Sequence, residues 1–337
     1  GVLADRRQRQ HIVVAALVLS ALASGGLAAQ VALGEVAPWQ IILAAFLAGS
    51  AFTLYAPARL ALLPNLVPDD MLLSASTVEY SSTRLMGFVG PMVGGALVDV
   101  IDISPTLVFQ VILLVGAMVI FMGTGLHLSD AQRDTSGPSR WLASMNEAVD
   151  YLRQDRPLFA LGVLGLVFVP FGMTFQKLMP VFAKNALGAG ASTLGLLLGV
   201  SSLGTALSGY GVAAVGDTFR KGRALLLCSI LFGSGMMLLA LCRSIWMASI
   251  LLFVLGLVSG VYLTLSNVLF QSRPPDALRG RVMSVWGMVW GILPFTSLLA
   301  GAVADTWSVT LAIGASGALC AVFSTGIALR RTRVGKL

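Results

Sequence analysis

Two ionisable side chains, Glu79 and Arg84, interrupt an otherwise apolar run from residue 71 to residue 98. If the run is a helix that begins at Met71, Glu79 lies about 12 Å along it, at ~1.5 Å per residue. Burial at that depth penalises an ionised acid and favours its neutral form. Arg84 follows five residues later, about 140° around a helix, so the two do not form an intrahelical pair. Two interpretations stay open: a structural acid paired with a neighbouring helix, or a proton carrier beside an arginine that positions an anionic group.

The rest of the chain is as poor in charge as this run. Of 337 residues, 57% are hydrophobic and 11% are charged, against about 25% charged in an ordinary soluble domain. Nine strings without a charged residue can each hold a membrane-spanning helix of about 20 residues, and 71–98 makes a tenth. They are 12–34, 36–58, 103–126, 157–176, 185–216, 224–242, 244–272, 282–304 and 306–329. The sequence therefore predicts an all-α membrane protein with about ten transmembrane helices.

The cations predict the orientation of these helices. If alternate loops are assigned to one side, that side collects 18 of the 22 Lys and Arg residues, from Arg6 to Lys336. Cytoplasmic loops retain Lys and Arg, so we expect the linker and the C-terminus on the cytoplasmic side of a bacterial inner membrane. The net charge of +7 then reflects topology in the lipid bilayer, and we expect no nucleic-acid partner.

Residues with catalytic or metal-binding spacing are missing from the sequence pattern. The three cysteines have no paired spacing, and the two histidines lie singly at predicted helix ends. No zinc signature, phosphate-binding loop or nucleophile elbow is present. We expect neither an enzyme nor a resident cofactor or metal.

A polar stretch from His127 to Pro157 divides the chain into two parts. The expected organisation is an N-terminal half (1–126, about four helices), a cytoplasmic linker (127–156) and a C-terminal half (157–337, six helices). From Ser139 onward the linker has the pattern of a short amphipathic helix, which lies either on the inner membrane surface or against the protein. Both placements stay open.

The two halves repeat one another. "PDDMLLSAS" in the first half corresponds to "PDALRGRVMS" in the second, and "ADRRQR" near the start corresponds to "GDTFRKGR" after residue 215. Parallel repeats in a polytopic chain indicate a duplicated bundle. Because the second half has two more predicted helices before its acidic-basic turn, we expect two helices before Gly1, ten being present of twelve.

The chain resembles the major facilitator superfamily, in which the loop between helices 2 and 3 has the pattern G-x-L-A-D-R-x-G-R-R. Gly1, Leu3, Ala4, Asp5, Arg6 and Arg9 match it, whereas Gln8 and Gln10 depart from it. The pattern G-P-x-x-G-G of the fifth family helix is matched by Gly90, Pro91, Gly94 and Gly95. "PARLALLPNLVPDDMLLSAS" and "LRGRVMSVWG" resemble more narrowly the bacterial transmembrane secretion effectors, which include siderophore and macrolide exporters. The resemblance implies a bundle of two pseudo-symmetric halves that transports small molecules.

The resemblance also implies a set of residues that closes the cytoplasmic side, here termed the cytoplasmic lock. An acid at the end of one helix is attracted to the positive N-terminus of another by about 0.3–1 kcal/mol. Asp5 would face the helix that starts near Gly280, and Asp217 the helix that starts near Leu72. The alternative is that these charges only set topology. The predicted lock consists of Asp5, Arg6, Arg9, Asp217, Arg220, Arg223 and Arg281.

A stripe of small residues marks the predicted helix that contains Glu79. Glycines allow close approach of helices in lipid, where packing drives association. We therefore interpret the stripe as a helix-packing motif rather than as a substrate contact, with a kink at the proline. Its members are Gly87, Gly90, Pro91, Gly94 and Gly95.

The sequence thus predicts a secondary transporter that exports a small amphipathic compound, such as a drug, siderophore or secondary metabolite. Alternating access and proton antiport are the expected mechanism. The alternatives are uptake, uncoupled facilitation, or a membrane scaffold without transport.

Overall fold

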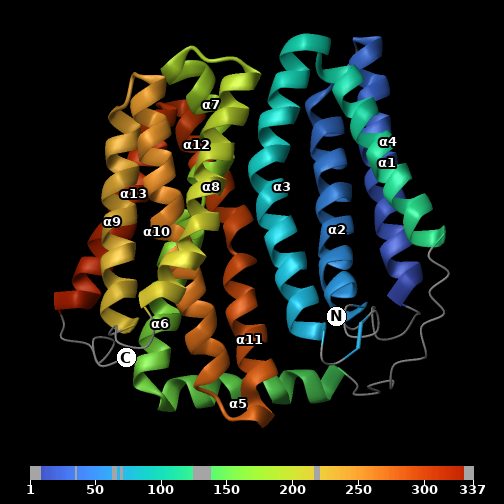
Figure 1. Ribbon diagram of the computed structural model, residues 1–337. Coiled ribbons are helices and arrows are strands. Elements are labelled where there is room, and N and C mark those ends of the chain that lie inside the picture. The colour runs from blue at the N-terminus through green and yellow to red at the C-terminus, as the bar shows by residue number, and fades with distance from the viewer. Residues whose placement is uncertain are drawn as a thin grey trace. The chain divides into compact units, whose positions relative to one another are not determined.

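The computed structural model describes residues 9–34, 36–62, 67–68, 71–123, 138–215 and 221–329. The first four helices are long (Figure 1). Each follows an apolar stretch of the sequence. They are α1 (Arg9–Leu33), α2 (Pro38–Leu62), α3 (Leu72–Ile101) and α4 (Ile103–Gly123). α3 continues through Pro91, and Asp102, with a positive φ of 72°, separates it from α4.

The remaining helices begin with the predicted linker helix, α5 (Pro138–Gln154). Two of the later spans are interrupted. One consists of α6 (Arg156–Val167), a π-helical turn (Phe168–Gly172) and α7 (Phe175–Leu187), and the other of α11 (Asp276–Trp290) and α12 (Leu293–Thr306). The continuous helices are α8 (Ala191–Val215), α9 (Lys221–Leu241), α10 (Ile245–Ser272) and α13 (Val309–Leu329).

Ten helical segments of the described part of the chain are long and apolar enough to cross a membrane. They coincide with the ten runs predicted from the sequence, with each interrupted pair counting as one segment. The all-helical membrane fold is therefore confirmed.

The chain forms two compact units. The first contains residues 1–83 and 96–135, and the second contains residues 84–95 and 136–337. The middle of α3 and the linker helix α5 thus belong to the second unit. The predicted division into halves 1–126 and 157–337 with a separate linker stays a prediction.

In the first unit, α1 packs against both α2 and α4. Small side chains line these contacts, among them the buried Ala16, Ala28 and Ala51. The hydroxyl of Ser104 on α4 donates to the carbonyl of Ala28 on α1 at 3.0 Å. Close packing through small residues is typical of helices in lipid.

The second unit has its aromatic core around the π-helical turn. The ring of Phe168 stacks on Tyr262 of α10 at a centroid distance of 3.7 Å and lies 4.9 Å from Phe232 of α9. α8 and α10 cross where glycines face each other's backbone: a Cβ on Gly256 would lie 2.0 Å from the carbonyl oxygen of Ser201. Only glycine permits that approach, so this crossing fixes the register of the two helices.

Candidate functional site

Glu79 is paired with an arginine of the neighbouring helix. Arg59, in the last turn of α2, donates through Nη2 to Oε1 of Glu79 and to the hydroxyl of Thr83 at 3.2 Å. Thr83 lies one turn after Glu79 on α3, 3.4 Å from the same carboxylate oxygen. The three side chains form a polar cluster between α2 and α3.

The aromatic ring of Tyr55 completes this cluster. Tyr55 precedes Arg59 by one helical turn, and the Arg59 guanidinium lies 5.5 Å from its ring centroid, within the range of a cation–π contact. The side chains of Arg59 and Glu79 are 39% and 20% exposed, so the acid is the better shielded of the two. Among the described residues, Nε of Arg59 is buried without a hydrogen-bond partner. Neutralising Glu79 would therefore leave a partly desolvated cation beside Tyr55.

Arg59 follows the uncharged run 36–58 that predicted the second span. α2 continues past it to Leu62, so Arg59 lies inside the helix. The depth of Glu79 in the membrane stays a prediction. Arg84, further along α3, is engaged in an interaction of its own.

Most members of the predicted cytoplasmic lock fall outside the described residues: Asp5, Arg6, Asp217 and Arg220. Arg9 is the first residue of α1, and Arg223 is exposed in the first turn of α9. Arg281 on α11 forms an ion pair with Glu147 of α5. From the sequence, we expected Arg281 to belong to the cytoplasmic lock at the helix start that Asp5 faces.

Further contacts join the linker helix to the turn between α10 and α11. The carboxylate of Asp155 accepts a hydrogen bond from the backbone N–H of Leu158 at 3.1 Å, which caps α6. Its other oxygen lies 3.4 Å from Nε of Arg273, and the hydroxyl of Tyr151 donates to the carbonyl of Arg273 at 3.3 Å. Ala148 and Leu152 are buried on the same helix. Of the two placements left open by the sequence, α5 packs against the protein (Figure 1).

The glycine stripe of α3 makes its close contact at one end. A Cβ on Gly95 would lie 2.3 Å from the carbonyl oxygen of Ala191, whereas one on Gly87, Gly90 or Gly94 would meet nothing within 4 Å. The reciprocal contact is Gly195, whose Cβ would lie 2.2 Å from the carbonyl oxygen of Pro91. The helix-packing role of Gly87, Gly90 and Gly94 stays a prediction.

The π-helical turn brings the two interrupted spans together. The carbonyl of Pro170 accepts hydrogen bonds from the hydroxyls of Thr174 and, at 2.8 Å, of Thr296 on α12. The two hydroxyls are 3.2 Å apart. π-Helical turns leave backbone groups without their usual helical partners, and two threonines satisfy one of them here. The sequence pattern did not predict this link.

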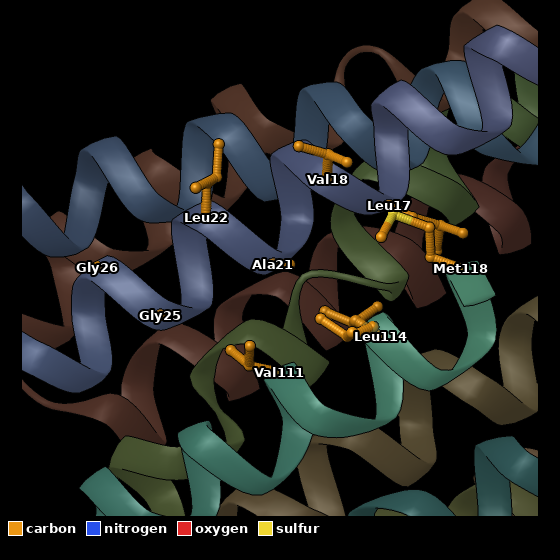
Figure 2. Close-up of a pocket in the computed structure, with 10 residues that line it drawn as sticks. Leu17, Val18, Ala21, Leu22, Gly25, Gly26, Val111, Leu114 and Met118 are labelled. Atoms are coloured by element: carbon orange, nitrogen blue, oxygen red, sulfur yellow. The ribbon is translucent and has the colours of Figure 1, made fainter.

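Two grooves in the described residues are lined by apolar side chains and glycines. One lies between α1 and α4, encloses about 420 Å³, and is lined by Leu17, Val18, Ala21, Leu22, Gly25, Gly26, Val111, Leu114, Val115 and Met118. Figure 2 shows side chains of the two helices along this groove. It offers no polar recognition. The second groove is lined by residues of α5, α6, α10 and α11. It is termed the α5 cavity and is described below.

The described residues contain no group of three or more His, Cys, Asp or Glu side chains that could hold a metal ion. The three cysteines are free thiols. The chemistry that this part of the chain offers is that of ion pairs, hydroxyl groups and apolar cavities.

Comparison with known proteins agrees with this inventory. The sequence profile of the transmembrane secretion effectors matches residues 1–337. The chain belongs to this family. It is a membrane transporter of the major facilitator type and not an enzyme.

Several curated relatives of this secretion effector are bacterial transporters. The macrolide efflux protein A of Streptococcus pyogenes is 24% identical over 90% of this chain and 76% of its own length. The staphyloferrin A transporter of Staphylococcus aureus is 23% identical over 80% of this chain and 66% of its own length. The enterobactin exporter EntS of Citrobacter koseri is 24% identical over 85% of this chain and 67% of its own length.

Solved structures support the same fold. A POT family transporter in complex with 5-aminolevulinic acid has a TM-score of 0.78 at 12% identity, over 98% of this secretion effector and 83% of that chain. A peptide transporter POT in complex with sulfate has a TM-score of 0.77 at 13% identity, over 99% and 82% of the two chains. At these identities the likeness concerns the fold alone.

Proposed function

We propose that this secretion effector exports a small amphipathic compound from the bacterial cytoplasm by alternating access, in exchange for protons. The names of its relatives supply the substrate class. The names specify macrolides, staphyloferrin A and enterobactin as their compounds. The finer claim of proton exchange rests on the cluster of Arg59, Glu79 and Thr83.

Glu79 is the acid that we assign to coupling. With Glu79 ionised, its charge holds Arg59 against α3 and ties α2 to α3 at this end. When Glu79 takes up a proton, the carboxyl group keeps hydrogen-bonding capacity but loses the charge that attracts Arg59. The guanidinium stays beside Tyr55 in either state. A hydrogen-bond donor of the compound would bind the Glu79 carboxylate only while that carboxylate is ionised. Proton and compound would thus compete for Glu79, and this mutual exclusion is the requirement for exchange.

The cytoplasmic lock enters the same proposal. Asp5 and Asp217 would hold the cytoplasmic side closed through the helix starts that they face. The pair between Arg281 and Glu147 adds α5 to this closure, because it ties the linker helix to the start of α11. In this proposal Arg84 positions an anionic group, and the linker and the C-terminus lie in the cytoplasm.

The substitution Glu79→Gln tests coupling. It removes the charge and the proton but keeps the shape, so gradient-driven efflux of a macrolide or dye should be lost while downhill exchange persists. Asp150→Asn is the control, because it also removes the acid of an ion pair with an arginine but neither the proposed proton site nor the cytoplasmic closure. A Glu79→Gln protein that pumps uphill at the wild-type rate would return Glu79 to a packing role.

A further inference from the structure

The α5 cavity, the second apolar groove, encloses about 290 Å³. It lies between the linker helix α5 and helices α6, α10 and α11 of the second unit. Its walls include Val149 and Leu152 of α5, Phe159 and Val163 of α6, and Trp286 of α11. The volume equals about ten water molecules at ~30 Å³ each, but apolar cavities of this kind stay dry. The cavity therefore suits an apolar occupant.

The cavity is open at part of its lining. Phe159 and Met288, which line it, are each 48% exposed, whereas Trp286 is 4% exposed. Phe159 and Met288 belong to segments long and apolar enough to span a membrane, Arg156–Leu187 and Leu278–Thr306. An acyl chain is an apolar group that a bilayer offers to such segments.

Two arginines continue the faces that line the cavity. Arg153 lies four residues after Val149 on α5, and Arg156 lies three residues before Phe159 and seven before Val163 on α6. Residues at these spacings share one face of a helix. Both arginines are exposed. They flank Asp155, where α5 gives way to α6.

The acids around this junction do not prevent the two arginines from binding a phosphate group. Asp155 is engaged with the backbone of Leu158 and with Arg273, and Glu147 is paired with Arg281. Asp150 approaches Arg153 at 3.6 Å, but both side chains are more than 60% exposed, at 64% and 68%. Such exposed pairs are weak and yield to a phosphate group.

We propose that this cavity and the two arginines bind an anionic phospholipid, with an acyl chain against Trp286 and the phosphate between Arg153 and Arg156. The lipid belongs to the leaflet on the side of α5, which is the cytoplasmic one in the topology proposed above. The bound lipid would fill the space between α5 and helices α6 and α11. It would thereby attach the linker helix to the membrane. Each arginine near the surface is expected to contribute about fivefold in affinity.

Trp286 reports on occupancy because it lies at the inner wall of the cavity, stacked on Phe270 with ring centroids 4.7 Å apart. The protein, with its other five tryptophans replaced by Phe, is reconstituted in vesicles that contain brominated phosphatidylglycerol or brominated phosphatidylcholine. The same measurement in the native background, corrected with Trp286→Phe, guards against misfolding of the single-tryptophan protein. We expect phosphatidylglycerol to quench Trp286 at a severalfold lower mole fraction than phosphatidylcholine.

Two variants separate the parts of the proposal. Arg153→Gln with Arg156→Gln should abolish the headgroup preference, while Lys184→Gln with Arg243→Gln, a matched loss of two cations elsewhere, should preserve it. Gly162→Leu should lower quenching by both lipids, because Gly162 lines the cavity and its Cβ would meet only Phe270, at 4.0 Å.

Equal quenching by both lipids in the unmodified protein, or a preference that survives Arg153→Gln with Arg156→Gln, would overturn the proposal. Displacement of quenching by a macrolide, without any headgroup preference, would assign the cavity to the transported compound instead.

Discussion

Gly165 and Gly162 provide a matched test of the packing in the second unit. Both are glycines of α6, so replacing either by alanine gains the same helical preference, about 0.5–1 kcal/mol. Their surroundings differ. A Cβ on Gly165 would lie 2.3 Å from Cζ3 and 2.8 Å from Cη2 of Trp286, whereas a Cβ on Gly162 would have its nearest neighbour at 4.0 Å.

The Trp286 ring has little freedom to move away. It stacks on Phe270 and donates from Nε1 to Oδ1 of Asn267 at 3.0 Å. Overpacking at such a place costs about 1–3 kcal/mol. Because the helical term is common to both variants, the difference in unfolding free energy between Gly165→Ala and Gly162→Ala should be about 1–3 kcal/mol, with Gly165→Ala the less stable.

Thermal unfolding in detergent, followed by tryptophan fluorescence, measures this difference. Gly162→Ala should melt at or above the wild-type temperature and Gly165→Ala below it, with an altered Trp286 emission before unfolding. Equal melting temperatures for the two variants would show that Trp286 does not press on α6 as described.

Three other predictions follow from the described geometry. In a cysteine-free background, Gly190→Cys should react with an impermeant thiol reagent from outside, and Gln154→Cys only after permeabilisation; external labelling of Gln154→Cys would reverse the orientation. Gly256→Ala should lower the melting temperature because its Cβ would lie 2.0 Å from the Ser201 carbonyl oxygen, while Gly209→Ala, with nothing within 4 Å, should not; equal melting would refute the α8–α10 crossing. Glu147→Gln and Arg281→Gln should each increase proteolysis in α5, with a coupling of about 0.2–1 kcal/mol in a double-mutant cycle since the pair is partly exposed; additive effects would mean that the pair does not hold α5.

Hydropathy predicted the ten spans and the linker helix because both depend on local composition. An uncharged string of 20 residues has few alternatives to a membrane helix. The i, i+4, i+7 spacing of Met145, Val149 and Leu152 marks one face of α5, whichever partner that face packs against. These features needed no knowledge of which helices are neighbours.

The partners of the charged residues could not be predicted in the same way. Arg59 meets Glu79 across a helical hairpin, and Arg281 meets Glu147 across 134 residues of sequence. The uncharged run 36–58 ends before Arg59, and composition does not show that α2 continues past a charged residue. One signal was available: the end of α2 and the start of α3 lie on the same side of the membrane, so their charged side chains are natural partners.

The interruptions of the helices could not be predicted from the sequence either. The π-helical turn at Phe168–Gly172 depends on Thr296, which donates to the Pro170 carbonyl from 126 residues away. Pro170 alone indicates a hinge, but it does not indicate which helix stabilises it.

Transport by inside-out membrane vesicles tests the proposed export most directly. With the vesicle interior made acidic, the wild-type protein should accumulate a labelled macrolide or siderophore, and an uncoupler should release it. The Glu79→Gln protein should equilibrate the same compound without accumulating it. Accumulation that ignores the pH gradient, or accumulation only in right-side-out vesicles, would contradict proton-driven export.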